Sequence, residues 1–143
     1  MDIRHLDKRA SAAPQIAPTE IEQVKAAGFA ALLNNRPDHE EPGQPTSEQM
    51  SSAAAAAGLR YAHIPLGQEP LTAEMINAVR EALDAANGAT LLFCRSGTRS
   101  TTLWGLAEAM AGRDIDDIVA CASAAGYDLN PYRGAMQALA TAD

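Results

Sequence analysis

The chain has 143 residues, 47% of them apolar and 4% aromatic, and its formal net charge is −7. This composition predicts one globular domain over residues 1–143 with a core of aliphatic side chains. The acidic balance argues against binding to nucleic acid or to anionic membranes, because both require a basic surface.

Short apolar runs predict the strands of a sheet, because each run is too short for a helix and is bounded by turn-forming residues. The runs alternate only weakly between polar and apolar residues, which is typical of a parallel sheet buried on both faces. In chain order the predicted strands cover 3–6, 12–16, 29–33, 60–66 and 89–93, the first two as edge strands.

Helices are predicted between and after these runs, and three of them begin with capping residues. Thr19 with Glu22, and Thr46 with Gln49, have the spacing of a capping box. Thr72 precedes a third helix, whose apolar residues recur at helical spacing. The predicted helices cover 19–28, 46–58, 72–87, the segment after residue 100 through Met110, 114–125 and 131–140.

This order of elements predicts an α/β fold: an open, mostly parallel sheet of about four to five strands with helices on both faces. The stretch 36–45 is expected to be an irregular loop, because it holds three prolines and a glycine. Ligands of such folds bind at the carboxyl ends of the strands. Cys94 directly follows the most apolar strand, so the loop that it opens is the first candidate for a functional site.

The loop 94–100, Cys-Arg-Ser-Gly-Thr-Arg-Ser, combines a nucleophile with groups that stabilise anions. Cysteine reacts as the thiolate, and the N-terminus of the following helix favours that charge. Arg95 and Arg99 add positive charge, and Gly97 allows successive N–H groups to turn inward as an anion-binding nest. We therefore predict that Cys94 and Arg99 are catalytic. The other predicted substrate contacts are Arg95, Ser96, Gly97, Thr98 and Ser100, whose hydroxyl is expected to donate to the sulfur.

Several further motifs accompany this loop: Asn-Asn-Arg-Pro-Asp at 34–38, Glu-Pro-Gly-Gln-Pro at 41–45, His-Ile-Pro at 63–65, Leu-Trp at 103–104 and Ala-Gly-Tyr-Asp-Leu at 125–129. With them the chain resembles, from residue 3 to about 139, the phosphatase-like domain of beta-lactamase-hydrolase-like proteins, a family also described as candidate sulfur transferases. The resemblance implies a fold like that of dual-specificity cysteine phosphatases.

The spacing within the loop favours a thiolate-dependent sulfurtransferase. Four residues separate Cys94 from Arg99, as in rhodanese-like loops, whereas cysteine phosphatases have five. Cys94 would take sulfur from a small anionic donor such as thiosulfate and pass it, as a persulfide, to a thiol or cyanide. The alternatives are a cysteine-dependent phosphatase that forms a phosphocysteine, and a non-catalytic redox-sensing or binding module.

A phosphatase also requires a general acid for the leaving oxygen. The Asp that dual-specificity phosphatases carry for this purpose is absent from the loop 67–70. Glu69 is a substitute candidate, as are Asp38 and Glu40 on the proline-rich loop, although all three are more simply exposed loop carboxylates.

The remaining expectations concern single residues and partners. Arg36 is a further candidate for substrate binding, with pairing to Asp38 or Glu40 as its alternative, and Cys121 is expected to be a packing residue. The histidines lack metal-ligand spacing, so neither a metal nor another cofactor is expected. With two cysteines and no signal-peptide pattern, a cytoplasmic location is expected. The expected partners are a small oxyanion or persulfide substrate and a sulfur-oxidising enzyme, without nucleic acid or membrane.

Overall fold

The computed structural model describes residues 1–141, and within them five strands form one sheet in the order β1-β2-β5-β3-β4. Four strands run parallel, and β1 pairs antiparallel with β2 at one edge. The predicted α/β fold with a mostly parallel sheet is therefore confirmed. The strands are β1 (Arg4–His5), β2 (Ala10–Ala13), β3 (Phe29–Asn34), β4 (Arg60–His63) and β5 (Ala89–Phe93).

Strands β2 and β4 each end three residues before their predicted ends, and proline explains both differences. A proline has no N–H to donate to a neighbouring strand. Pro14 ends β2 at Ala13, and Pro65 interrupts the ladder after β4, although Ile64 and Leu66 still donate their N–H groups to carbonyls at the end of β3, at 2.9 and 3.0 Å.

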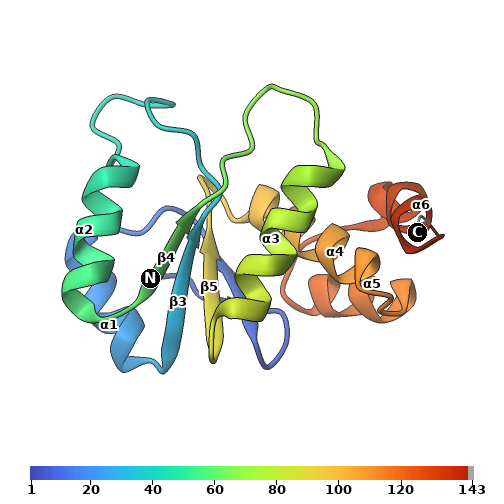
Figure 1. Ribbon diagram of the computed structural model, residues 1–143, viewed down its shortest axis with the longest axis horizontal. Coiled ribbons are helices and arrows are strands. Elements are labelled where there is room, and N and C mark those ends of the chain that lie inside the picture. The colour runs from blue at the N-terminus through green and yellow to red at the C-terminus, as the bar shows by residue number, and fades with distance from the viewer. Residues whose placement is uncertain (142–143) are drawn as a thin grey trace.

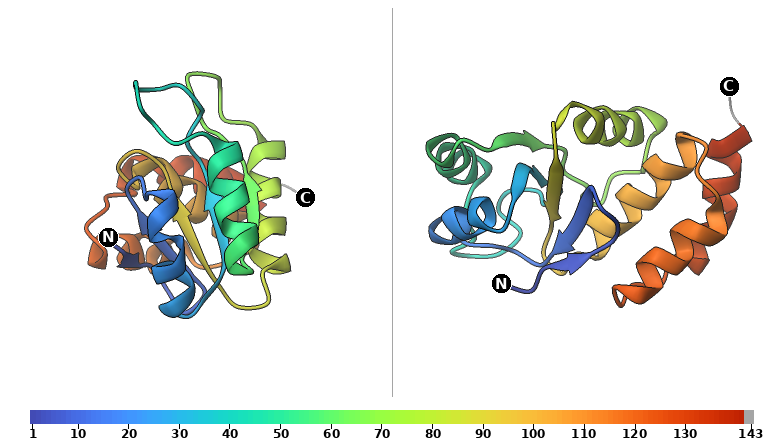
Figure 2. Two further views of the ribbon diagram at one scale, coloured as in Figure 1. Left: turned by 90° about the vertical axis from the view of Figure 1, so that its left-hand side faces the viewer. Right: turned by 90° about the horizontal axis from the view of Figure 1, so that it is seen from below.

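Helices cover both faces of the sheet, as predicted (Figure 1). On one face lie α1 (Ile21–Ala26) and α2 (Ser47–Ala57), and on the other lie α3 (Ala73–Ala85) and α4 (Thr98–Met110). The last two helices, α5 (Ile115–Ala124) and α6 (Arg133–Thr141), pack on the outer side of α4, as the view from below in Figure 2 shows. Short 3₁₀ turns, η1 (Pro18–Glu20) and η2 (Asn130–Tyr132), precede α1 and α6.

The capping predictions hold at α2 and α3 and fail at α1. Thr46 and Gln49 form the predicted reciprocal pair, at 3.1 and 2.9 Å, and Thr72 accepts from the Met75 N–H at 3.2 Å. The predicted box at Thr19 is wrong, because the chain enters its 3₁₀ turn already at Pro18.

The core has two parts that share the sheet. Alternate residues of the central strand β5 point to opposite faces, so Leu91 and Phe93 pack toward α1 and α2, while Leu92 packs toward α3 and α4. Helix α4 is buried along nearly its whole length, and Trp104 at its middle is fully covered. The Cys94 loop leads into the first turn of this buried helix, so Cys94 and Ser100 are buried, whereas Arg95, Ser96 and Thr98 remain exposed.

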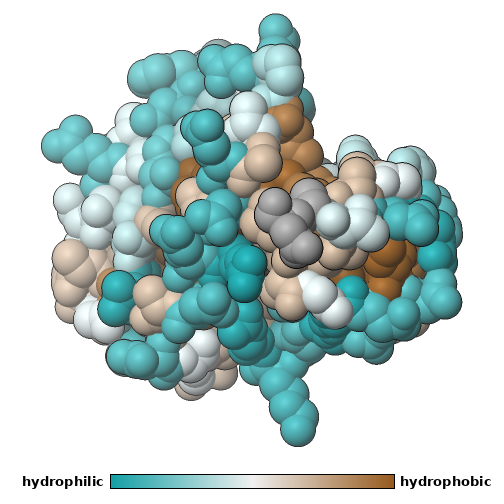
Figure 3. Space-filling model, turned by 45° about the vertical axis from the view of Figure 1, so that its right-hand side comes forward, coloured by the Kyte–Doolittle hydropathy of each residue, from teal (hydrophilic) through white to brown (hydrophobic). Residues whose placement is uncertain are grey.

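The surface is mainly polar. The face drawn in Figure 3 is mostly hydrophilic, with apolar side chains visible in gaps between polar ones. Within residues 1–141 no helix is both long and apolar enough to cross a membrane.

Candidate active site

Cys94 is the first residue after β5, at the carboxyl edge of the sheet, and its side chain is fully buried. The Gly97 N–H donates to Cys94 Sγ at 3.1 Å. Gly97 directly precedes α4 and has a φ of 90°, a left-handed conformation that glycine adopts without a steric penalty. The loop thus turns a backbone donor toward the sulfur at a helix N-terminus, where negative charge is favoured.

Arg99, in the first turn of α4, is held by acceptors from two other loops. Its Nη1 and Nη2 donate to the two carboxylate oxygens of Glu40 at 2.7 and 2.8 Å, and Nη1 also donates to the Leu66 carbonyl at 2.7 Å. A guanidinium has five N–H groups in one plane. Three of these N–H groups of Arg99 are used by Glu40 and Leu66, which leaves the edge formed by Nε–H and the adjacent Nη2–H outside these contacts.

Cys94 acts on the guanidinium of Arg99 both through its charge and as a hydrogen-bond partner, so the two groups lie close together. The hydrogen bond with Glu40 raises the pKa of Arg99 above its ordinary value, and the negative charge of Cys94 adds to the effect, against a lowering by burial. An edge with two parallel N–H groups is the part of a guanidinium that binds an oxyanion in a bidentate manner. Arg99 can therefore bind an anion beside Cys94 without releasing Glu40.

Glu40 is the centre of a small ion network. Its Oε1 accepts from Nε of Arg36 at 2.8 Å in addition to the two contacts with Arg99. The pKa of Glu40 is lowered from 4.5 to about 2, first by the hydrogen bond from Arg99 and further by Arg36, against burial. A carboxyl that stays ionised at neutral pH cannot donate a proton, so Glu40 does not suit the role of general acid.

Arg36 is buried, and all three of its nitrogens are engaged. Nε and Nη2 donate to Glu40 and Glu41, and Nη1 donates to Gln15 at 3.0 Å. The candidate role of Arg36 in substrate binding therefore gives way to the alternative of pairing on its own loop, although Glu41 takes the place expected for Asp38. Arg36 supports the site indirectly, because it holds the carboxylate that holds Arg99.

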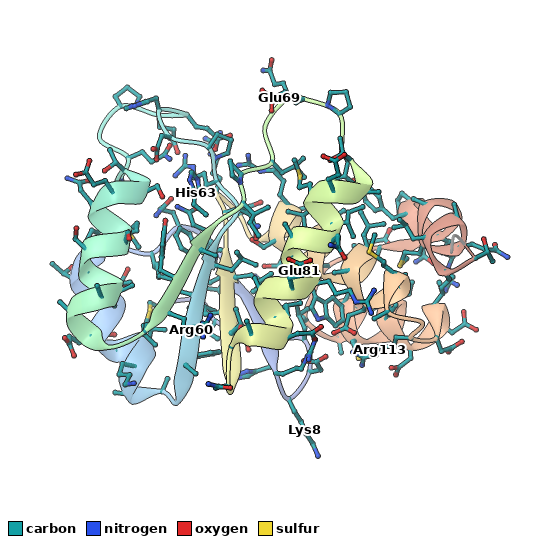
Figure 4. The ribbon with its side chains drawn as sticks, viewed as in Figure 1. Lys8, Arg60, His63, Glu69, Glu81 and Arg113 are labelled. Atoms are coloured by element: carbon teal, nitrogen blue, oxygen red, sulfur yellow. The ribbon has the colours of Figure 1, made fainter. Side chains whose placement is uncertain are left out.

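The other carboxylates considered as acids lie in different settings. Asp38 accepts the Ser47 N–H at 2.8 Å, at the start of α2. Glu69 is exposed on the loop between β4 and α3, and Figure 4 shows its side chain at the tip of that loop, pointing away from the body of the molecule. Neither residue has a hydrogen bond to the Cys94 loop among the described residues.

The hydrogen bond expected from Ser100 to the sulfur is wrong, whereas its contact with substrate stays a prediction. Its hydroxyl donates to Oδ1 of Asn35 at 2.8 Å, not to the sulfur. Asn35 is fully buried at the end of β3, and its side-chain amide donates to the Ile64 carbonyl at 3.0 Å. A buried amide oxygen requires a donor, and Ser100 faces it across the carboxyl edge of the sheet.

The exposed part of the loop forms its outer rim. Arg95 is 65% exposed, with Nε 3.4 Å from Glu41, and Ser96 donates its hydroxyl to that of Thr98 at 3.1 Å. These side chains are free to meet a ligand that enters from solvent.

Cys121 lies away from this site on α5. It packs against the core that contains α4, and Arg113 Nη2 lies 3.4 Å from its sulfur. His63, labelled in Figure 4, has its Nε2 2.8 Å from the Arg36 carbonyl and thus braces the same loop.

Two groups of residues at the site were not assigned a role from the sequence. Asn34 and Asn35 end a buried strand, and polar residues in that position of a parallel sheet are a usable signal. Tyr127, whose hydroxyl donates to the Ser96 carbonyl at 3.3 Å, comes from the turn after α5 and gave no comparable signal.

Two curated relatives of this chain are both named Beta-lactamase hydrolase-like protein. It is 38% identical over 128 residues to the Beta-lactamase hydrolase-like protein of Agrobacterium fabrum, covering 87% of this chain and 29% of that protein. The protein of the same name from Xylella fastidiosa Temecula1 is 34% identical, with coverage of 90% and 30%. The chain therefore spans about 30% of the length of these curated relatives.

Solved structures agree with this fold. A candidate phosphatase from Neisseria meningitidis Z2491 superposes with a TM-score of 0.82 at 31% identity, covering 97% of this chain and 99% of the other. Tk-PTP in its active form has a TM-score of 0.73 at 16% identity, with coverage of 97% and 95%, which supports the fold alone. The family model for the phosphatase-like domain of Beta-lactamase hydrolase-like protein matches residues 2–111, and the chain belongs to that family.

Proposed function

We propose that this domain is a cysteine-dependent phosphatase, in which Cys94 attacks the phosphorus of a small phosphate ester. The observation that carries the proposal is that Cys94 Sγ, which accepts the Gly97 N–H, lies beside the guanidinium of Arg99, whose Nε edge is not used by Glu40 or Leu66. The family and the structural relatives named above support phosphatase over sulfurtransferase chemistry. This reverses the order of preference that the loop spacing suggested.

The reaction divides into two displacements on phosphorus. In the first, the thiolate forms a P–S bond while the P–O bond to the leaving group breaks, and the leaving group departs with the electron pair. In the second, water attacks the phosphocysteine, the P–S bond breaks, and inorganic phosphate and the thiolate are released. Arg99 and the N–H groups of the loop stabilise the phosphoryl oxygens in both steps, where charge develops.

The surroundings of the site restrict the leaving group. Among the described residues, Glu40 is held ionised, and Asp38 and Glu69 make no hydrogen bond to the Cys94 loop. Without a positioned acid the leaving oxygen must depart unprotonated, which favours aryl or acyl phosphates over alkyl phosphates. Hydrolysis rates across substituted aryl phosphates should therefore fall steeply as the pKa of the leaving phenol rises.

A rhodanese-like sulfurtransferase is the second candidate, and the four-residue spacing between Cys94 and Arg99 favours it. In that reaction Cys94 attacks the outer sulfur of thiosulfate, the S–S bond breaks, and sulfite leaves without needing a proton. An acceptor thiol, such as that of a sulfur-oxidising partner enzyme, would then take the sulfur from the persulfide.

Intact mass spectrometry distinguishes the two candidates in one experiment. The chain is mixed briefly with an aryl phosphate or, anaerobically, with thiosulfate, then quenched in acid, and Cys94→Ser is the control. A gain of one phosphoryl group from the ester, absent from the control, supports the phosphatase. A gain of one sulfur atom from thiosulfate alone would replace it with the sulfurtransferase, and no adduct with either reagent would leave the redox-sensing module as the working interpretation.

A further inference from the structure

One peptide unit of the Cys94 loop is held from both sides. The N–H of the peptide between Ser96 and Gly97 donates to Cys94 Sγ at 3.1 Å, and the carbonyl of that same peptide accepts from the Tyr127 hydroxyl at 3.3 Å. The peptide is planar, so its C=O and N–H point in opposite directions and cannot turn independently. A group that fixes the carbonyl therefore also fixes the N–H that faces the sulfur.

Packing against Tyr127 is too close for any side chain at position 97. A Cβ built on Gly97 would lie 2.2 Å from the Tyr127 oxygen and 3.1 Å from its ring carbon Cζ. The hydroxyl of Tyr127 therefore lies directly against the backbone of the loop. Position 97 requires a glycine for two reasons, the close approach of Tyr127 and the positive φ.

Tyr127 is itself fixed by the N-terminal segment. The guanidinium of Arg4 lies over the tyrosine ring, 5.3 Å from its centre, and donates to the Ala125 carbonyl at 3.3 Å. Asp2 pairs with the other side of Arg4 at 3.2 Å. The Tyr127 N–H donates to the Ala122 carbonyl at 2.9 Å, so the residue is tied to the end of α5 and cannot move freely.

We propose that Tyr127 is a positioning residue for Cys94: its hydroxyl anchors the Ser96–Gly97 peptide with the N–H aimed at the sulfur. Because hydrogen bonds in series polarise one another, donation to the carbonyl also strengthens the N–H as a donor to the thiolate. Tyr127 acts through this peptide and needs no contact with substrate. The assignment rests on Cys94 being the reactive thiol and holds for either chemistry considered above.

The protonation state of Tyr127 suits a donor. Burial raises its pKa above 10.0, and the charges of Asp2 and Cys94 add to this, whereas Arg4 opposes it. The phenol therefore keeps its proton at neutral pH. The charged groups that surround Cys94 and Tyr127 on the loop, the N-terminal segment and the end of β3 are Asp2, Arg4, Arg36, Glu40, Glu41, Arg95 and Arg99.

The test is Tyr127→Phe, which keeps the ring and its contact with Arg4 and removes only the hydroxyl. The control is Tyr132→Phe, since Tyr132 is 38% exposed on η2 and lies outside the site. Both changes are made in a Cys121→Ser background, so that iodoacetamide can label only Cys94. The readout is the rate of Cys94 alkylation as a function of pH, which does not depend on knowing the substrate.

We expect the Tyr127→Phe profile to move to higher pH and the alkylation rate at neutral pH to fall about three- to tenfold, as for the loss of one hydrogen bond. The midpoint of thermal unfolding and the profile of the control should stay close to the parent. A second variant, Arg4→Met, loosens the clamp on Tyr127 and should shift the profile in the same direction but less. An unchanged profile in Tyr127→Phe would overturn the proposal, whether or not the chain hydrolyses aryl phosphates. If Tyr127→Phe lost aryl phosphate hydrolysis but kept the parent's pH profile of Cys94 alkylation, that result would overturn the proposal as well.

Discussion

Replacing Glu40 with Gln tests the ion network that orients Arg99. The lowering of the Glu40 pKa from 4.5 to about 2 corresponds to about 3 kcal/mol of stabilisation. The side chain is 26% exposed, so solvent screening reduces the expected loss in the variant to about 1–2 kcal/mol. Because the folded-state pKa is depressed, this contribution is present above the unfolded pKa and disappears as the pH falls from about 4.5 toward 2.

Urea unfolding measures this prediction directly. At neutral pH the Glu40→Gln variant should unfold at a lower urea concentration than the parent, and the difference should shrink near about pH 3. Glu69→Gln makes the same chemical change at an exposed loop residue without a partner in the network, and it should alter stability by less than about 0.5 kcal/mol.

The same variant distinguishes two roles for Glu40 at the site. If Glu40 orients Arg99 so that the Nε edge of the arginine faces Cys94, the Glu40→Gln variant loses one ionic contact that fixes this orientation. The variant should then bind inorganic phosphate about tenfold more weakly than the parent, the equivalent of about 1.4 kcal/mol. Tighter phosphate binding in Glu40→Gln would mean that the carboxylate competes with the ligand for Arg99. That result, or a stability difference that does not depend on pH, would refute the reasoning.

Three further changes follow from the same contacts. Cys94→Ser should abolish turnover of any substrate in steady-state assays, and retained turnover would exclude Cys94 as the nucleophile. Ser100→Ala should cost about 1–3 kcal/mol in urea unfolding, because it leaves the buried Oδ1 of Asn35 without its donor; an unchanged unfolding curve would contradict this. Cys121→Ser should leave kcat/KM within about twofold of the parent, because Cys121 packs on α5 away from the Cys94 loop; an inactive variant would show that the second cysteine takes part.

Local sequence signals were sufficient for the sheet and for the place of Cys94 at its carboxyl edge. A run of apolar residues bounded by turns predicts a strand wherever it occurs, and Cys94 follows such a run directly. Two strand ends and one helix cap were misplaced where a proline changed the backbone, at Pro14, Pro65 and Pro18.

Side-chain partners across the fold were harder to predict. Ser100 was expected to donate its hydroxyl to the sulfur of Cys94, but the hydroxyl donates instead to the buried Oδ1 of Asn35, 65 positions earlier. Arg36 and Arg99 both carry charge that suits an oxyanion, and only the folded loop decides that Glu40 engages both and leaves an edge of Arg99 free. Periodicity and capping rules contain no information about such long-range pairs.

The segment after residue 111 lies beyond the family match but contributes to the same structure. Helix α4 is buried on most sides because α5 and α6 cover its outer face. At Gly105 this packing is so close that a Cβ would lie 2.6 Å from Leu129 and 3.3 Å from Ile118. Uncovering the large apolar side chains of α4 would cost about 1.5–3 kcal/mol each. The C-terminal helices therefore stabilise the helix that presents the Cys94 loop, and the turn between them holds the loop itself through Tyr127.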